Sequence, residues 1–260
     1  MLELNQRLAT RARGKEPSPI RELLGYLKIE GMISLGGGYP NPDTFVFERV
    51  DVRFKDGSKA SLEGTELTVA SQYGASDAHA GLRDELIAWH RSKDGVELDG
   101  SQLVVTNGSQ EGLFIMPYLF ADPDDSIALS EPAYPGALSA FKSFTHNFVA
   151  VPLDENGMDT SALERELSSI AEAGGKLPKF IYTVPSGHNP GGVALSLPRR
   201  KHMMEIARRF DVLVLEDDPY QLVKMNDADV LPSLQSMDED GRVVRLDSFS
   251  KVFAPGLRIG

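Results

Sequence analysis

Cysteine is absent from the 260 residues of this chain, which excludes disulfides, zinc–thiolate sites and thiol nucleophiles. Long apolar runs are absent too, since none approaches the roughly 18 uninterrupted residues of a membrane-spanning helix. Positive charge is in deficit, with 27 Lys and Arg against 38 Asp and Glu and a formal net charge of −11. A chain this acidic is not suited to the phosphate backbone of nucleic acid. We therefore expect neither a nucleic-acid partner nor a membrane partner.

The rest of the composition is that of an ordinary globular protein, with 41% hydrophobic and 25% charged residues. Residues 1–15 lack the apolar core of a secretory signal and carry four basic side chains, Arg7, Arg11, Arg13 and Lys15. We interpret this segment as a solvated, flexible arm, with a short mitochondrial presequence as the alternative. The expected location is the cytoplasm, or mitochondria under that alternative.

After residue 100, short apolar runs alternate with helical patterns. The runs are Leu103–Thr106, Ser126–Leu129, Phe148–Val151, Phe180–Val184, Val212–Leu215 and Val243–Leu246. Helical spacing of apolar residues marks the segments around 163–171 and 203–210. This alternation predicts an α/β fold, in which a mostly parallel central sheet is covered by helices on both faces.

Three further elements are predicted outside this alternation. Val50–Phe54 alternates in polarity and runs into Asp56 and Gly57, which indicates a hairpin. Apolar residues at 82, 86 and 89 indicate a helix that packs one face. The segment after Gly108 has a helical pattern but contains Pro117, so we expect a kink or an early break there.

Ligands of such sheets sit at the carboxyl ends of the strands, and polar residues follow several of the predicted strands. After residue 106 comes a glycine turn that opens a helix, where free N–H groups and the Ser109 hydroxyl suit an anion. An ordinary helix cap is the alternative there. After the second run comes Tyr134, which is placed either to stack on a flat ligand or to pack at the rim of the core.

Residues 185–192, after the run Phe180–Val184, form a long loop of turn residues. In this loop Asn189 presents an amide beside a proline, and we expect His188 to be solvated. The next strand ends in carboxylates at 216, 217 and 218, which repel one another and call for a compensating cation. Their spacing fits no metal site, so we predict no metal. A protonated aromatic nitrogen of a ligand would suit one of them.

The last predicted strand leads into Lys251, which lies in an apolar segment close to Ser248 and Ser250. A partly desolvated lysine has a lowered pKa and can act as a nucleophilic amine. Arg258, together with the two serines, could hold a phosphate. A surface lysine and arginine beside a serine turn is the alternative. Taken together, the groups at successive strand ends match the demands of one cofactor, pyridoxal 5′-phosphate.

Four stretches resemble the fold-type I aminotransferases: TNGSQEGL, EPAYPG, YTVPSGHNPGG with VLEDDPY, and DSFSKVFAPGLRIG. PSPIRELL and ISLGGGYPNP resemble more specifically the kynurenine/2-aminoadipate aminotransferase branch, which includes the fungal aromatic aminotransferases. The resemblance runs from Ser18 to Gly260. It implies an N-terminal arm and substrate-side loop over residues 1–45 and an incomplete cofactor-binding large domain over 46–260. The family's small C-terminal domain, which carries the arginine for the substrate carboxylate, is expected to be missing.

The resemblance also implies roles for single residues. Lys251 would condense with the cofactor aldehyde and then transfer a proton, and Asp217 would pair with the pyridine nitrogen. Asn189 and Tyr220 would hydrogen-bond to the phenolic oxygen of the ring, and Tyr134 would stack on its face. Ser109, Gln110, Ser248, Ser250 and Arg258 would hold the phosphate.

Further implied roles lie outside this set. Tyr73 would reach the phosphate of a partner subunit, so a homodimer is implied. Arg21 and Gly38 would line the substrate pocket together with Asn189. Gly191, where relatives usually have threonine, is expected to loosen the loop that carries Asn189.

The implied function is transamination between an aromatic amino acid, kynurenine or 2-aminoadipate and a 2-oxo acid such as 2-oxoglutarate. A pyridoxal-phosphate lyase or synthase of the same fold is an alternative, as is an inactive fragment. A non-catalytic regulator is a third, but it would need a basic DNA-binding domain of roughly 70 residues before Arg21. Only about twenty residues precede that position.

Overall fold

The chain was analysed as a computed structural model, which describes residues 2–16, 26, 29–31, 38–223 and 231–260. Its contacts divide it into two units. The larger unit comprises Met1–Arg13 and Asp84–Gly260, and the smaller comprises Gly14–Arg83. The functional division predicted between residues 45 and 46 stays a prediction.

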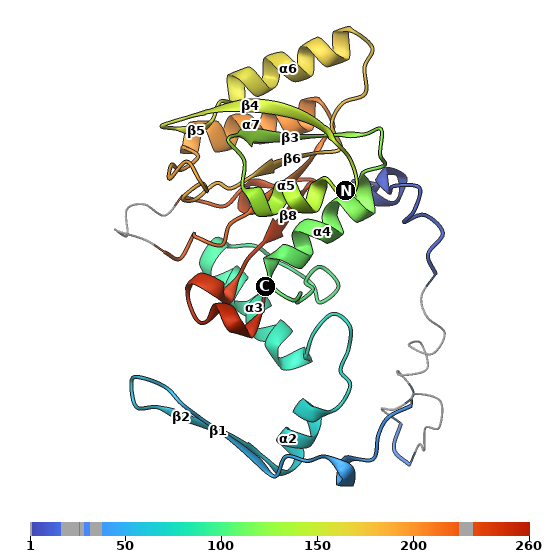
Figure 1. Ribbon diagram of the computed structural model, residues 1–260, viewed down its shortest axis with the longest axis vertical. Helices are drawn as coiled ribbons and strands as arrows, with labels where there is room; N and C mark the ends of the chain where they lie inside the picture. The colour runs from blue at the N-terminus through green and yellow to red at the C-terminus, as the bar shows by residue number, and fades with distance from the viewer. Residues whose placement is uncertain (1, 17–25, 27–28, 32–37, 224–230) are drawn as a thin grey trace. The chain divides into compact units, whose positions relative to one another are not determined.

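A six-stranded sheet in the order β5-β4-β3-β6-β7-β8 forms the centre of the larger unit (Figure 1). The strands are β3 Ser126–Glu131, β4 Asn147–Asp154, β5 Gly157–Met158, β6 Phe180–Thr183, β7 Leu213–Asp217 and β8 Val243–Leu246. Each pair is parallel except β4 with β5. The predicted mostly parallel sheet is therefore confirmed, and five of the six predicted apolar runs are strands.

The remaining predicted run, Leu103–Thr106, is not a strand. Only Thr106 has a ladder-like partner, because its N–H and C=O bond to the backbone of Gly260 at 2.7 and 3.3 Å. A strand is defined by a row of such bonds, and a single residue pair does not make one. The prediction was wrong because an apolar run does not reveal whether a neighbouring strand pairs with it.

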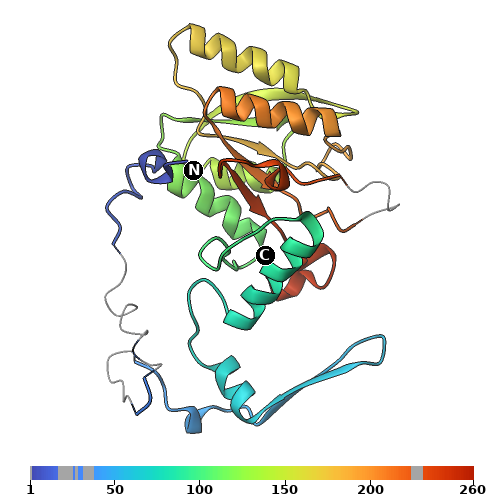
Figure 2. The same ribbon diagram turned by 180° about the vertical axis from the view of Figure 1, so that it is seen from behind.

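Helices cover both faces of the sheet, as predicted (Figures 1 and 2). On one face lie α4 (Ser109–Phe120) and α5 (Pro135–Phe141), and on the other lie α6 (Thr160–Glu172) and α7 (Leu197–Arg209). Side chains alternate between the two cores: Phe180 and Tyr182 pack with α4 and α5, whereas Ile181 packs with α6 and α7. Each face of the sheet therefore has its own hydrophobic core.

The same alternation decides which way the end of β7 faces. Leu213 and Leu215 belong to the α4–α5 core, and Val214 belongs to the α6–α7 core. Successive side chains of a strand point to opposite faces. Asp217 therefore continues on the side of α4 and α5, and Glu216 lies on the opposite side.

The predicted early break at Pro117 does not occur, because helix α4 continues to Phe120, whereas the alternative of a kink stays a prediction. Its apolar face is buried through Leu113, Met116 and Pro117 itself. The Arg11 guanidinium donates to the carbonyls of Pro117 and Ala121 at 3.4 and 2.7 Å. Burial and this cap together offset the roughly 3 kcal/mol that an interior proline costs.

The predicted flexible arm is also corrected, because its described residues pack on the larger unit. A 3₁₀ helix spans Leu4–Arg7, and Ala9 and Ala12 are buried. Thr10 bonds to the Asp122 carboxylate through both its N–H and its hydroxyl, at 2.9 to 3.1 Å. Alanines spaced three apart place one apolar side of the segment against the core. The basic residues between them made this apolar side hard to recognise in the sequence.

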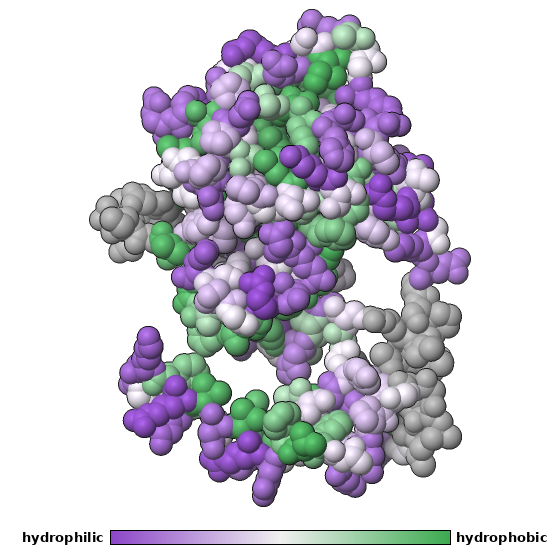
Figure 3. Space-filling view, viewed as in Figure 1, coloured by the Kyte–Doolittle hydropathy of each residue, from purple (hydrophilic) through white to green (hydrophobic). Residues whose placement is uncertain are grey.

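The smaller unit holds the predicted hairpin, formed by the antiparallel strands β1 (Arg49–Arg53) and β2 (Lys59–Glu63). Helix α2 (Gly64–Ser71) follows. Large apolar side chains are exposed on this unit, including Val46, Phe47 and Val69. Figure 3 shows hydrophobic (green) surface on this unit. Patches of this kind are typical of surfaces that another protein covers.

The remaining elements are one long helix and several short 3₁₀ turns. The predicted helix at 82–89 is α3 (Ala80–Asp94), and 3₁₀ turns cover Pro42–Thr44, Gln235–Met237, Phe249–Lys251 and Pro255–Leu257. Within the described part of the chain, no helix combines the length and the apolar character needed to cross a membrane.

Candidate active site

A cavity of about 290 Å³ lies where β6, β7 and β8 end at their carboxyl sides. Ten residues that we singled out in the sequence line it: Ser109, Gln110, Tyr134, Asn189, Asp217, Tyr220, Ser248, Ser250, Lys251 and Arg258. Val184, Pro219 and Pro255 complete the lining. Parallel strands end at the same edge of a sheet, which is why segments up to 149 residues apart in the chain meet here.

Three further predicted site residues remain: two belong to the smaller unit, and one lies outside the described residues. Tyr73 and Gly38 belong to the smaller unit. The Tyr73 side chain is 71% exposed and its ring lies edge-on to Tyr39, with centroids 6.2 Å apart. Gly38 is exposed with φ +63°, and Arg21 lies outside the described residues. Their roles stay predictions.

Asp217 is the buried charge of the site, with only 3% of its surface exposed. The Tyr182 hydroxyl donates to its Oδ2 at 2.8 Å, and its Oδ1 is buried without a hydrogen-bond partner among the described residues. Burial raises the pKa of Asp217 to about 6, and the Tyr182 hydrogen bond acts in the opposite direction. Asp217 lines the cavity, and one oxygen of its buried carboxylate has no hydrogen-bond partner among the described residues.

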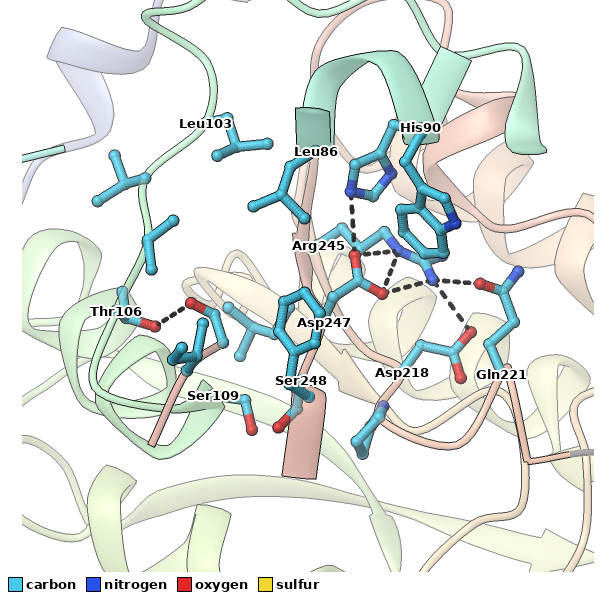
Figure 4. Close-up of a pocket in the computed structure, with 18 of the residues that line it drawn as sticks. Leu86, His90, Leu103, Thr106, Ser109, Asp218, Gln221, Arg245, Asp247 and Ser248 are labelled. Atoms are coloured by element: carbon cyan, nitrogen blue, oxygen red, sulfur yellow. Dashed lines mark hydrogen bonds and ion pairs between the residues drawn. The ribbon is translucent and has the colours of Figure 1, made fainter. Parts of the chain in front are cut away.

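Arg245, a residue that the sequence reasoning missed, compensates the carboxylates on either side of Asp217. Figure 4 shows its contacts with the carboxylates of Asp218 and Asp247. Its guanidinium lies 3.4 Å from Glu216, 3.7 Å from Asp218 and 2.9 Å from Asp247. Burial raises the pKa of Asp218 to about 7, and Arg245 opposes this. The cation expected beside the three carboxylates is thus supplied by the protein for two of them. The sequence does contain a signal for this cation, because Arg245 is the one charged residue in the apolar run VVRL.

At the N-terminus of α4, a glycine allows an arginine to lie close to the helix. Gly108 has φ +76°, and a Cβ built on it would lie 2.3 Å from Nη2 of Arg258. That nitrogen donates to the carbonyl of Asn107 at 3.4 Å. The free N–H groups of the first turn and a guanidinium therefore lie together, which is a favourable place for an anion.

Lys251 ends the 3₁₀ helix Phe249–Lys251, and the Ser248 hydroxyl caps this helix by accepting from the N–H of Ser250 at 3.1 Å. The amine of Lys251 lies 5.9 Å from the centroid of the Tyr220 ring. The residue is exposed, so the expected partial desolvation is wrong. The helix lies at the surface, where the adjacent Val252 is 43% exposed as well.

Two aromatic rings and an amide, from the segments that follow β3, β6 and β7, also line the cavity. The Asn189 amide lies 3.5 Å from the hydroxyl of Tyr220. Tyr134 is half-buried and folds back over Gly136, where a Cβ would lie 2.6 Å from its ring. Burial raises the pKa of Tyr134, and the nearby Asp217 and Tyr220 add to this. The phenols and the buried carboxylate therefore act on one another electrostatically.

His188 is buried, at 4% exposure, and not solvated as expected. The Gly191 N–H donates to its Nδ1 at 3.2 Å, and its Nε2 lies 2.7 Å from the hydroxyl of Ser130. A neutral imidazole with an acceptor at Nδ1 carries its proton on Nε2, so the ring donates to Ser130. A Cβ on Gly191 would lie 3.0 Å from Nδ1. The loop that Gly191 was expected to loosen is held by this ring.

Replacing this histidine should destabilise the fold. His188→Ala removes a buried ring, takes away the shorter of the two hydrogen bonds of the Ser130 hydroxyl and removes the side-chain acceptor of the Gly191 N–H. We expect the free energy of unfolding to fall by about 2–4 kcal/mol. Chemical denaturation measures this, with His146→Ala at an exposed position as the control. Equal stability of the two variants would contradict the role given to His188.

The comparisons with known proteins agree with this geometry. Residues 39–260 match the family model "Aminotransferase class I and II". The chain is 36% identical over 259 residues to aromatic-amino-acid aminotransferase 1 of Thermococcus litoralis, covering 100% of this chain and 60% of that protein. It is 37% identical over 267 residues to the mitochondrial kynurenine/alpha-aminoadipate aminotransferase of Bos taurus, covering 95% and 61%.

A solved structure shows the same architecture. The aminotransferase Aro8 of Candida albicans superimposes with a TM-score of 0.87 at 28% identity, over 100% of this chain and 63% of that one. The chain thus spans about 60% of the length of the curated relatives named here. A match over residues 39–260 that includes every residue lining the cavity leaves one conclusion: the chain belongs to the class I and II aminotransferase family.

Proposed function

We propose that this chain is the cofactor-binding part of an aminotransferase that exchanges the amino group of an aromatic amino acid, kynurenine or 2-aminoadipate with a 2-oxo acid such as 2-oxoglutarate. The observation that carries the proposal is the cavity, where the unpartnered carboxylate oxygen of Asp217, the amine of Lys251 and the N-terminus of α4 lie together. The amino donors are those that the names of the relatives give.

Pyridoxal phosphate is the cofactor of this family, and the residues of the cavity fit it. An unpartnered, buried carboxylate oxygen suits a protonated ring nitrogen, and the anion site at α4 suits a phosphate. When bound, the cofactor supplies an aldehyde that takes up amino groups and a ring that disperses negative charge from the substrate carbon.

The residues that line the cavity have distinct roles in this proposal. The amine of Lys251 would hold the aldehyde and would later move the proton at the substrate carbon. Asp217 keeps a proton on the ring nitrogen. Asn189 and Tyr220 donate to the phenolic oxygen, and Tyr134 covers one face of the ring, which restricts its orientation and excludes water.

The phosphate is assigned to the first turn of α4 and to the serines after β8. Ser109, Gln110, Ser248, Ser250 and Arg258 are the proposed contacts. Each offers an N–H or hydroxyl donor, and Arg258 adds a full positive charge next to the positive end of the helix dipole.

A glycine substitution tests the phosphate site. Gly108→Ala places a methyl group where the Arg258 guanidinium lies, so we expect the affinity for pyridoxal phosphate to fall about ten- to hundredfold. Affinity for pyridoxal, which lacks the phosphate, should change little. The matched control is Gly174→Ala, at φ +67° with open space around it, which introduces the same backbone strain alone. Equal loss for both ligands would overturn the assignment.

The homodimer is proposed from the resemblance and from the surface of the smaller unit. Val46, Phe47 and Val69 are 88%, 63% and 51% exposed. Tyr73, proposed to reach the partner's cofactor phosphate, follows soon after Val69 in the sequence and is exposed as well. Arg21 and Gly38 are proposed to line the substrate pocket. The compartment, for which we expect the cytoplasm, stays a prediction.

Amino-donor profiling tests the reaction itself. The chain is incubated with pyridoxal phosphate, 2-oxoglutarate and single amino donors, and glutamate formation is measured. Glutamate from aromatic amino acids, kynurenine or 2-aminoadipate supports the proposal. Consumption of the donor without glutamate would favour a lyase or synthase of the same fold. Cofactor binding without any consumption would contradict catalysis by this chain alone.

A further inference from the structure

Tyr182 holds Asp217 from inside the protein core. Its side chain is fully buried in β6, and its hydroxyl donates to Oδ2 of Asp217 at 2.8 Å. The ring of Phe141 meets the Tyr182 ring edge-on at 5.2 Å and 85°, and meets Phe180 in the same way at 5.6 Å and 80°. The aromatic packing therefore leaves the hydroxyl little freedom to turn away from the carboxylate.

This contact gives the two oxygens of Asp217 different tasks. Oδ2 accepts from Tyr182, whereas Oδ1 has no partner among the described residues, although Asp217 lines the cavity. Tyr182 itself is not among the residues that line the cavity. Its hydroxyl donates one hydrogen bond among the described residues, to Asp217, so the hydroxyl would act on a ligand there through that carboxylate.

No side-chain cation is paired with Asp217 in the described part of the chain. Arg245 bonds instead to Glu216, Asp218 and Asp247, and Asp247 acts on Asp217 as a like charge. The phenols of Tyr134 and Tyr220 and the cations Lys251 and Arg258 line the same cavity. The Tyr182 hydroxyl is the one hydrogen-bond donor to the Asp217 side chain that the described residues provide.

We propose that Tyr182 is a positioning residue that keeps Asp217 ionised and turns its free oxygen toward the ring nitrogen of the bound cofactor. The inference rests on the proposed function and extends it to a residue buried behind the site. The physical reason is that a carboxylate buried without a donor takes up a proton and can then no longer hold a positive charge on its partner. One charge-assisted hydrogen bond counteracts that cost.

The first test uses the chain without cofactor. Because burial raises the folded-state pKa of Asp217 above its unfolded value, its contribution to stability is lost as pH rises from about 4 through about 6. Tyr182→Phe should raise that pKa further. At each pH the unfolding equilibrium constant of the variant is divided by that of the native chain. We expect this ratio to grow about ten- to hundredfold between about pH 4 and about pH 8.

A double-mutant cycle separates this effect from simple loss of packing. In the background Asp217→Asn, the change Tyr182→Phe should destabilise the chain equally at every pH. Tyr118→Phe on α4 is the matched control, since it also removes a phenol hydroxyl from a ring that packs on a phenylalanine. A Tyr182→Phe effect that is independent of pH in the native background would overturn the proposal.

The second test measures binding of two ligands. Pyridoxal phosphate should bind Tyr182→Phe about ten- to hundredfold more weakly than it binds the native chain. An analogue with carbon in place of the ring nitrogen has no proton to share with Asp217, so the substitution should leave its affinity unchanged. Equal losses for both ligands indicate a structural role and reject the inference.

A third variant covers the case in which Tyr182→Phe does not fold. Incorporation of 3-fluorotyrosine at position 182 keeps the ring and makes the hydroxyl a stronger donor, so the pH profile should shift in the opposite direction, to lower pH. An unchanged profile rejects the inference. If the native chain binds neither ligand, the proposed function fails, whereas the cofactor-free pH profile still tests the Tyr182–Asp217 contact.

Discussion

Lys251→Ala should abolish covalent retention of pyridoxal phosphate and lower the transamination rate by at least about 10²–10⁴-fold. Lys251 lines the same cavity as Asp217, and its amine lies 5.9 Å from the centroid of the Tyr220 ring. No second lysine lines that cavity among the described residues, so no nearby amine replaces it. The measurement is absorbance at the edge of the visible range after addition of cofactor, followed by borohydride reduction and peptide mass spectrometry.

Lys201→Ala is the matched control, because it removes an exposed lysine on α7, away from the site. It should retain the absorbance band and the labelled peptide that contains residue 251. If Lys251→Ala kept a full band, or if the label appeared on another peptide, the assignment of Lys251 would be wrong.

Asp217→Asn should have two opposite effects, on function and on stability. A neutral amide cannot hold a positive charge on the ring nitrogen, so we expect affinity for pyridoxal phosphate to fall about ten- to a few hundredfold. The cofactor-free chain should become more stable than the native chain above about pH 6, because a buried carboxylate no longer has to ionise there. Below about pH 4 the two should have similar stability.

Fluorescence titration with the cofactor and denaturation across the pH range measure the two effects on the same samples. Asp218→Asn is the control one residue along the chain. Its carboxylate is buried and paired with Arg245, and it does not line the cavity. It should leave cofactor affinity near the native value. A variant at 217 that loses stability at every pH, or binds cofactor normally, would contradict the role given to this carboxylate.

The sequence predicted most of the cavity because its residues follow strands that apolar runs make easy to locate. Asp217, Asn189 and Lys251 each come shortly after such a run, and parallel strands bring their ends together. The failed predictions share one cause, because each depended on contacts with segments distant in the sequence. Leu103–Thr106 lacks a row of pairing partners, Pro117 is tolerated because its helix is packed and capped, and His188 is buried because Ser130 faces it.

Among three adjacent carboxylates, only tertiary structure shows which one faces the cavity. The alternation along β7 places Glu216 on the opposite side, and Arg245 from β8 neutralises it together with Asp218. The partner of Asp217, Tyr182, comes from β6, 35 residues earlier. Linear spacing contains no information about contacts between neighbouring strands.

The order of apolar runs and polar turns by itself determined an α/β sheet with chemistry at its carboxyl edge, because local periodicity and turn residues are written into the chain. What the folded chain decided is electrostatic: which carboxylate stays unpartnered, how high its pKa rises, and which hydroxyl holds it. Those properties depend on burial and on distances of a few ångströms between segments far apart in sequence, and these exist only once the strands have paired.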